Sequence, residues 1–162
     1  EAENIDIIKK ADSTSTFGWQ CGKRFDERAK MVLEAAGNPT CIKQMPFIAR
    51  MDLAYKAADL VISRAGASSI SELCLLGKPV ILVPSPNVAE DHQTKNAEAL
   101  SSKGAAILVR DTEARQRLMP CALSVVHDEE SLTSMSREIA ALAQRDSAAR
   151  IADIIFDIVN KK

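Results

Sequence analysis

Two short apolar runs, separated by one helix-length segment, constrain the fold of this chain more than any other feature. Leu60–Ser63 and Val80–Pro84 are apolar at nearly every position, which is typical of strands that are buried on both faces. Between them, Ser69–Leu76 has a helical pattern that stops at Gly77. Strands of this kind joined by helices predict a parallel sheet with helices on both sides.

The same alternation of strands and helices extends along the rest of the chain. We expect further helices at residues 3–11, 24–36, 51–58, 91–103, 131–143 and 147–159, and further strands at 16–21, 40–44 and 105–109. The predicted fold class is therefore α/β, with a Rossmann-like, doubly wound parallel sheet. Such folds usually open on a strand, whereas this chain opens on a helical pattern. We therefore expect residues 1–162 to be a single domain whose truncated N-terminus lacks a first strand and the turn that follows it.

Composition narrows the classes of partner. The 162 residues carry 21 Lys and Arg against 22 Asp and Glu, so no net basic charge is available to attract a nucleic acid. The apolar runs are far shorter than the roughly 18 residues that a membrane-spanning helix needs. Four widely spaced cysteines and two histidines do not form a metal-binding pattern. We predict no nucleic-acid partner, no transmembrane segment and no metal site.

The turn between the two apolar runs is the first candidate binding site. Ligands bind open parallel sheets at the carboxyl ends of the strands, where helices begin with unpaired N–H groups. Gly66 and Ala67 lack bulk, so a ligand could approach their backbone, and Ser68 adds a hydroxyl. Arg64 comes just before this turn and could face a phosphate or pair with an acidic side chain. The turn is a candidate diphosphate site.

Glu72 has two interpretations. A carboxylate in the first turn of the helix would repel phosphate but would accept hydrogen bonds from both hydroxyls of a ribose. Ser69 and Glu72 also have the spacing of a capping box, in which the glutamate accepts a hydrogen bond from the N–H of the cap residue. Spacing alone does not choose between these roles.

A second helix start follows the next strand. In Glu90–Asn96, Asp91 is expected to be the N-cap, and His92 and Gln93 would project from the first turn toward sugar hydroxyls or a phosphate. A solvated helix start would explain the same residues. His127 lies in an acidic turn and is expected to be solvated.

Three motifs in order make the chain resemble a known family. Residues 58–73, 77–84 and 90–97 resemble the C-terminal, donor-binding domain of the MurG family of peptidoglycan glycosyltransferases. Weaker matches at Trp19–Lys23 and Phe47–Ile48 extend the resemblance over nearly the whole chain. Two departures are the absence of a phosphate loop before residue 3 and the presence of Cys21 where the family often has threonine.

The resemblance implies the C-terminal half of a GT-B glycosyltransferase. Such an enzyme is a hexosyltransferase that uses UDP-N-acetylglucosamine and inverts the anomeric centre as it converts lipid I into lipid II. The acceptor and the catalytic base would be bound or carried by an N-terminal domain, so this chain alone would be inactive and contains no expected catalytic residue. The full enzyme would work in cell-wall synthesis as a peripheral protein on the cytoplasmic side of the inner membrane, without a cofactor.

The resemblance also implies roles for individual residues. Ile48 would contact uracil near its backbone, Glu72 would hold the ribose, and His92 and Gln93 would meet the sugar and the diphosphate. The full expected substrate-binding set is Ile48, Arg64, Ala65, Gly66, Ala67, Ser68, Glu72, His92, Gln93 and Asn96. Two alternatives stay open: the donor domain of another GT-B UDP-sugar transferase, and a non-catalytic nucleotide-sugar-binding module or flavodoxin-like signalling domain.

Overall fold

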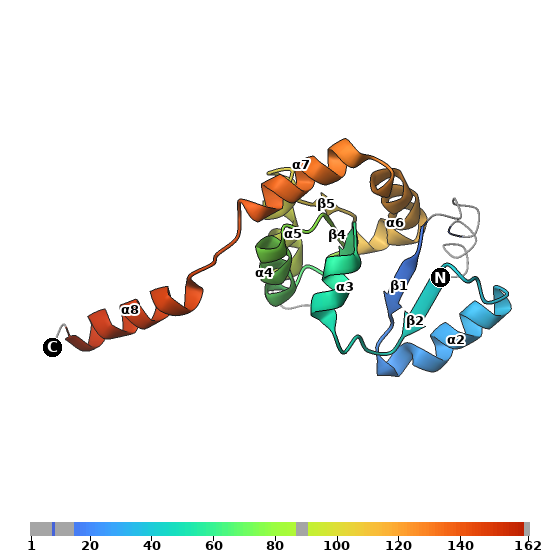
Figure 1. Ribbon diagram of the computed structural model, residues 1–162, viewed down its shortest axis with the longest axis horizontal. Helices are drawn as coiled ribbons and strands as arrows, with labels where there is room; N and C mark the ends of the chain where they lie inside the picture. The colour runs from blue at the N-terminus through green and yellow to red at the C-terminus, as the bar shows by residue number, and fades with distance from the viewer. Residues whose placement is uncertain (1–7, 9–14, 87–90, 161–162) are drawn as a thin grey trace.

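The computed structural model describes residues 8, 15–86 and 91–160, and its elements alternate between strand and helix as far as β5 (Figure 1). In chain order they are β1 (Phe17–Gln20), the 3-10 helix η1 (Lys23–Phe25), α2 (Asp26–Ala35), β2 (Ile42–Met45), α3 (Met51–Ala57), β3 (Val61–Ser63), α4 (Ala67–Leu76), β4 (Val80–Leu82), α5 (His92–Ser101), β5 (Ile107–Leu108), α6 (Asp111–Val126), α7 (Glu129–Ala140) and α8 (Ser147–Asn160). Apart from Ile8, the helix predicted at residues 3–11 lies outside the described residues.

All strand pairs are parallel, which confirms the predicted α/β class. Within the described residues the strands form two sheets, β1–β2 and β3–β4–β5, where a single sheet was predicted. In the larger sheet, Val61 pairs with Val80 and Ile81 pairs with Ile107. Because α4 and α5 each return the chain to the start of the next strand, the turns after β3 and β4 come out at the same edge.

Strand β4 is buried on both faces, as its unbroken apolar run predicts. Val80 and Leu82 point into one apolar cluster, which also contains Leu73 of α4 and Ile139 of α7. Ile81 lies in a second cluster on the other face, with side chains from α2, β2 and α6. All three β4 side chains have 0% exposure, so the elements packed on its two faces bury this strand completely.

Strand β3 does not share this burial, and here the prediction was wrong. Ile62, in the middle of β3, remains 39% exposed. The reason is position: in the described part of the chain β3 is an outer strand of its sheet, with β4 as its only neighbour. An apolar run indicates a strand, but the neighbouring elements decide whether both faces are covered.

Helix α4 ends where the sequence predicts and is held there by α7. Gly77 adopts the left-handed conformation (φ 63°, ψ 35°) that glycine allows without strain, and so closes the helix. The hydroxyl of Ser136 on α7 donates to the carbonyl oxygen of Gly77 at 2.7 Å. The position of α4 relative to the sheet is therefore set by side chains at its end as well as by Leu73 in its middle.

Helix α8 extends away from the rest of the molecule (Figure 1). It carries one apolar side that stays in solvent, with Ile151, Ile154, Ile155, Phe156, Ile158 and Val159 between 55% and 66% exposed. Of the helices in the described ranges, none combines the length and the apolar character that crossing a bilayer requires.

Candidate functional site

The site predicted at the carboxyl edge of the larger sheet begins with the turn after β3. Gly66 is the N-cap of α4 and no side chain of the described residues caps this helix start. Ala67 and Ser68, which open the helix, are exposed. The first N–H groups of a helix have no acceptor within the helix, so this start carries the partial positive charge of a helix N-terminus.

Two side chains of α5 tie this turn to the next helix start. The Oε1 atom of Gln93 accepts hydrogen bonds from the backbone N–H groups of Ala65 (3.2 Å) and Ser85 (2.9 Å). The amide of Asn96 donates to the carbonyl oxygen of Ala65 at 3.1 Å. The predicted juxtaposition of the two helix starts is thus confirmed. We call the joined residues, Arg64–Ser68 with Gln93 and Asn96, the rim.

Arg64 contributes to the rim by holding chain segments together. Its guanidinium donates to the carbonyl oxygens of Val83 (3.3 Å) and Pro84 (3.2 Å) and forms an ion pair with Asp111 at the start of α6. Of the two predicted roles for Arg64, the structure shows pairing with an acidic side chain. The guanidinium thereby links the ends of β3 and β4 to α6.

Glu72 lies on α4 beside α3, and the capping-box interpretation of this residue is wrong. The helix begins at Ala67, so Glu72 is in the second turn rather than the first. Its Oε2 atom accepts a hydrogen bond from the hydroxyl of Tyr55 at 3.3 Å. Because Ser69 lies inside the helix, it cannot cap the helix start, and the carboxylate stays exposed.

Asp91 occupies its predicted N-cap position but does not make the expected capping bond. It precedes α5 at the N-cap position, but its backbone is left-handed (φ 55°) and its side chain makes no capping bond to a backbone N–H. Instead Oδ1 accepts from the hydroxyl of Thr94 at 2.6 Å. His92 is exposed at the first position of α5, and His127 is exposed after α6, as predicted. Glu90 lies outside the described residues.

Ile48 lies in the loop between β2 and α3, at the end of the smaller sheet. Its backbone N–H donates to Oε1 of Gln20, the last residue of β1, at 2.8 Å. This bond fixes the loop to the strand end and leaves the neighbouring Phe47 side chain 67% exposed. Ile48 is thus held on the loop that leads into α3, the helix whose Tyr55 contacts Glu72.

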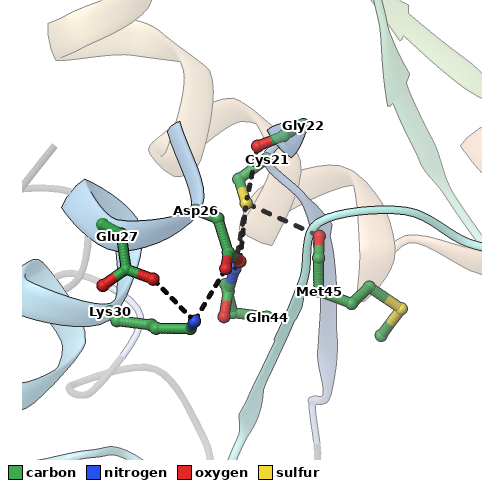
Figure 2. Close-up of polar contacts among 7 residues, drawn as sticks. All are labelled: Cys21, Gly22, Asp26, Glu27, Lys30, Gln44 and Met45. Atoms are coloured by element: carbon green, nitrogen blue, oxygen red, sulfur yellow. Dashed lines mark hydrogen bonds and ion pairs between the residues drawn. The ribbon is translucent and has the colours of Figure 1, made fainter. Parts of the chain in front are cut away.

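A polar cluster holds the ends of β1 and β2 to α2 (Figure 2). The amide of Gln44 donates to Oδ1 of Asp26 at 2.7 Å and to Sγ of Cys21 at 2.9 Å. Lys30, one turn further along α2, forms an ion pair with Asp26 at 2.7 Å. The Cys21 thiol donates to the carbonyl oxygen of Met45 at 3.5 Å. Cys21 is therefore part of the scaffold that supports the Gln20–Ile48 contact.

The same cluster predicts a pH dependence of stability. Hydrogen bonding from Lys30, and then from Gln44, lowers the pKa of the Asp26 carboxyl. The pKa of an Asp carboxyl in the unfolded chain is about 3.9. When folding lowers this pKa, the carboxyl stabilises the protein at pH values above about 3.9, and this stabilisation is lost as the pH falls through the pKa of the folded state. We expect Asp26→Asn to lower the free energy of unfolding at pH 7, and this difference to shrink between about pH 5 and pH 2.

Urea unfolding of the two proteins across this pH range measures the effect. Glu27→Gln is the matched control, because Glu27 contacts the same lysine with an 86% exposed side chain and should contribute little. A difference between Asp26→Asn and wild type that stays constant down to pH 2 would contradict the assignment.

The structure thus brings most of the predicted residues together and adds three others. The rim contains seven of the predicted residues, and His92 lies at the same helix start as Gln93. Glu72 contacts Tyr55 of α3, and Ile48 lies in the loop that leads into α3. Sequence reasoning missed Gln20, Tyr55 and Asp111, whose side chains hold Ile48, Glu72 and Arg64. No spacing pattern connects these pairs, since they form only when the elements pack. The described ranges contain no cluster of three or more potential metal-ligating acidic, histidine or cysteine side chains.

A match to a protein-family model shows to which family this chain belongs. The model of the glycosyltransferase family 28 C-terminal domain matches residues 4–151. The chain belongs to this family. The match includes the rim, Glu72 and Ile48, so the predicted site lies within the family 28 domain.

Relatives of this family 28 domain agree with the assignment. A protein of Parabacteroides distasonis is 60% identical over 145 residues, which are 89% of this chain and 39% of that protein. A Porphyromonas gingivalis protein is 56% identical over 151 residues, 93% of this chain and 40% of that protein. Both are named UDP-N-acetylglucosamine--N-acetylmuramyl-(pentapeptide) pyrophosphoryl-undecaprenol N-acetylglucosamine transferase. The chain therefore spans about two fifths of the length of these relatives.

The structural comparison gives the same result. The crystal structure of Acinetobacter baumannii MurG superposes with a TM-score of 0.83 at 29% identity, over 96% of this chain and 48% of that one. The Rossmann-like fold expected for the second half of a GT-B glycosyltransferase is thereby confirmed.

Proposed function

We propose that this chain is the donor-binding part of a glycosyltransferase that uses UDP-N-acetylglucosamine. Its main support is geometric. Gln93 accepts hydrogen bonds from the N–H groups of Ala65, after β3, and Ser85, after β4, so the N-termini of α4 and α5 lie together at one edge of the sheet. The 60% identity to a relative named as an N-acetylglucosamine transferase supports the choice of donor.

In this proposal the diphosphate lies on the rim. Phosphate oxygens can approach the backbone N–H groups of Gly66, Ala67 and Ser68, because these residues carry small side chains and no side chain caps the helix. The partial positive charge of the α4 and α5 starts would stabilise the charge that develops as UDP leaves. His92 and Gln93 would then face the sugar and the diphosphate.

The nucleoside would lie along α3. Glu72 is exposed and accepts a single hydrogen bond, from Tyr55, within the described residues, so its second oxygen can accept from ribose hydroxyls. The backbone of Ile48, held by Gln20, would contact the uracil. The donor would therefore extend from the Ile48 loop, past Glu72, to the rim.

We further propose that the acceptor is lipid I and that the product is lipid II. The acceptor hydroxyl would attack the anomeric carbon in a single displacement with inversion, as UDP departs. The longer relatives leave room for an acceptor-binding domain that would carry the base and contact the cytoplasmic face of the membrane. The proposal involves no cofactor, since the sugar is already activated as its UDP ester.

Calorimetry on the full-length protein tests the proposed donor. UDP-N-acetylglucosamine should bind more tightly than UDP-glucose or UDP-galactose. In a separate transfer assay, a lipid I analogue should accept the sugar. A clear preference for UDP-galactose would overturn the assignment in favour of another UDP-sugar transferase. Absence of binding by any UDP-sugar would remove the function altogether.

A further inference from the structure

Tyr55 contacts the carboxylate that the proposed function assigns to the ribose. Its hydroxyl, on α3, donates to Oε2 of Glu72, on α4, across a distance of 3.3 Å. The two helices are joined only through β3, so this bond is made by packing and not by neighbouring positions in one helix. No spacing motif predicts it.

The tyrosine ring is held by the core, whereas the glutamate is not. Tyr55 is partly buried and packs against the apolar cluster that contains Leu73 and Val80. A packed ring leaves its hydroxyl few positions, while an exposed glutamate side chain samples several rotamers. The contact therefore transfers the rigidity of the core to the Glu72 carboxylate.

We propose that Tyr55 is a positioning residue that holds the Glu72 carboxylate with Oε1 directed to the ribose hydroxyls of the bound nucleotide. This inference rests on the proposed function. Ordering the carboxylate before the nucleotide arrives lowers the entropy cost of binding, and this gain applies only to ligands that carry the hydroxyls.

The protonation state of Tyr55 agrees with this role. Burial, and then the charge of Glu72, raise the pKa of the phenol above its ordinary value of about 10. The hydroxyl therefore keeps its proton, and remains a donor to the carboxylate, throughout the neutral range.

The test is ribose discrimination by the full-length protein. We compare the calorimetric affinities for UDP and for 2′,3′-dideoxy-UDP in wild type and Tyr55→Phe, which keeps the ring and its packing. Wild type should prefer UDP about 10- to 100-fold, and Tyr55→Phe should reduce this preference about 3- to 10-fold without changing the affinity for dideoxy-UDP. If Tyr55 had a purely structural role, Tyr55→Phe would weaken the binding of both ligands equally.

Two further variants keep the test decisive. Tyr55→Leu also removes the hydroxyl and keeps an apolar side chain against the core cluster, so it should reduce the preference for UDP in the same way, and it serves if Tyr55→Phe does not fold. In a Glu72→Ala background, adding Tyr55→Phe should change neither affinity.

The outcomes separate this inference from the function on which it rests. Equal weakening of both ligands by Tyr55→Phe, or an unchanged preference for UDP, overturns the positioning role and leaves the donor assignment intact. If wild type itself does not distinguish UDP from dideoxy-UDP, the ribose role of Glu72 fails, and the inference fails with it.

Discussion

Replacing Glu72 with alanine is expected to weaken UDP binding about 10- to 100-fold, because hydrogen bonds to a charged group contribute about 1.5–3 kcal/mol. The free energy of unfolding should hardly change, since Glu72 is exposed and does not cap α4. Calorimetry with UDP and thermal unfolding of the same full-length protein measure the two quantities.

The control for this variant is Glu34→Ala. It removes the same charge from an exposed position near the end of α2, outside the proposed site. It should leave UDP affinity unchanged, which separates a local contact from a general effect of net charge. A folded Glu72→Ala protein with wild-type affinity for UDP would remove Glu72 from the binding site.

Gln93→Ala is expected to disturb both the rim and the binding of UDP. The substitution removes the acceptor of two backbone N–H groups, and Ala65, which carries one of them, has 0% exposure. An unpaired buried donor costs about 1–3 kcal/mol, and water can reach the second group, so we expect a loss of about 2 kcal/mol in the free energy of unfolding. UDP affinity should fall because the two helix starts are no longer tied together.

Gln93→Glu separates the two effects. A carboxylate oxygen can accept the same two backbone hydrogen bonds, so this variant should keep nearly wild-type stability. Its negative charge would repel a diphosphate on the rim and should weaken UDP binding about 10-fold or more. Urea unfolding and calorimetry give both numbers. If Gln93→Glu binds UDP as wild type does, the diphosphate does not lie beside Gln93.

The arrangement of elements was largely predictable from local patterns. The stop of α4 at Gly77 follows from a single residue that tolerates a left-handed backbone. The burial of Val80–Leu82 follows from an apolar run with no polar position. The meeting of the α4 and α5 starts follows from parallel strands, whose carboxyl ends share an edge.

Partners of individual polar side chains were less predictable. Asp91 occupies its predicted N-cap position, but its backbone is left-handed and its side chain makes no bond to a backbone N–H of α5. The capping-box alternative for Glu72 is wrong because α4 already starts at Ala67. Ser69 and Glu72 fit the spacing of a capping box, yet the helix begins too early for it to form. The residues that hold the site in place, Gln20 and Tyr55, carry no motif of their own.

The amino-acid sequence by itself determined the class of fold, the order of its elements and the edge of the sheet at which the candidate site lies, since these depend on periodicity and on residues with special backbone freedom. Only the tertiary structure decided that Tyr55 contacts Glu72, that Arg64 pairs with Asp111 and that Ile62 stays exposed. Each of these depends on which elements pack side by side, and such contacts join residues that are distant in the chain.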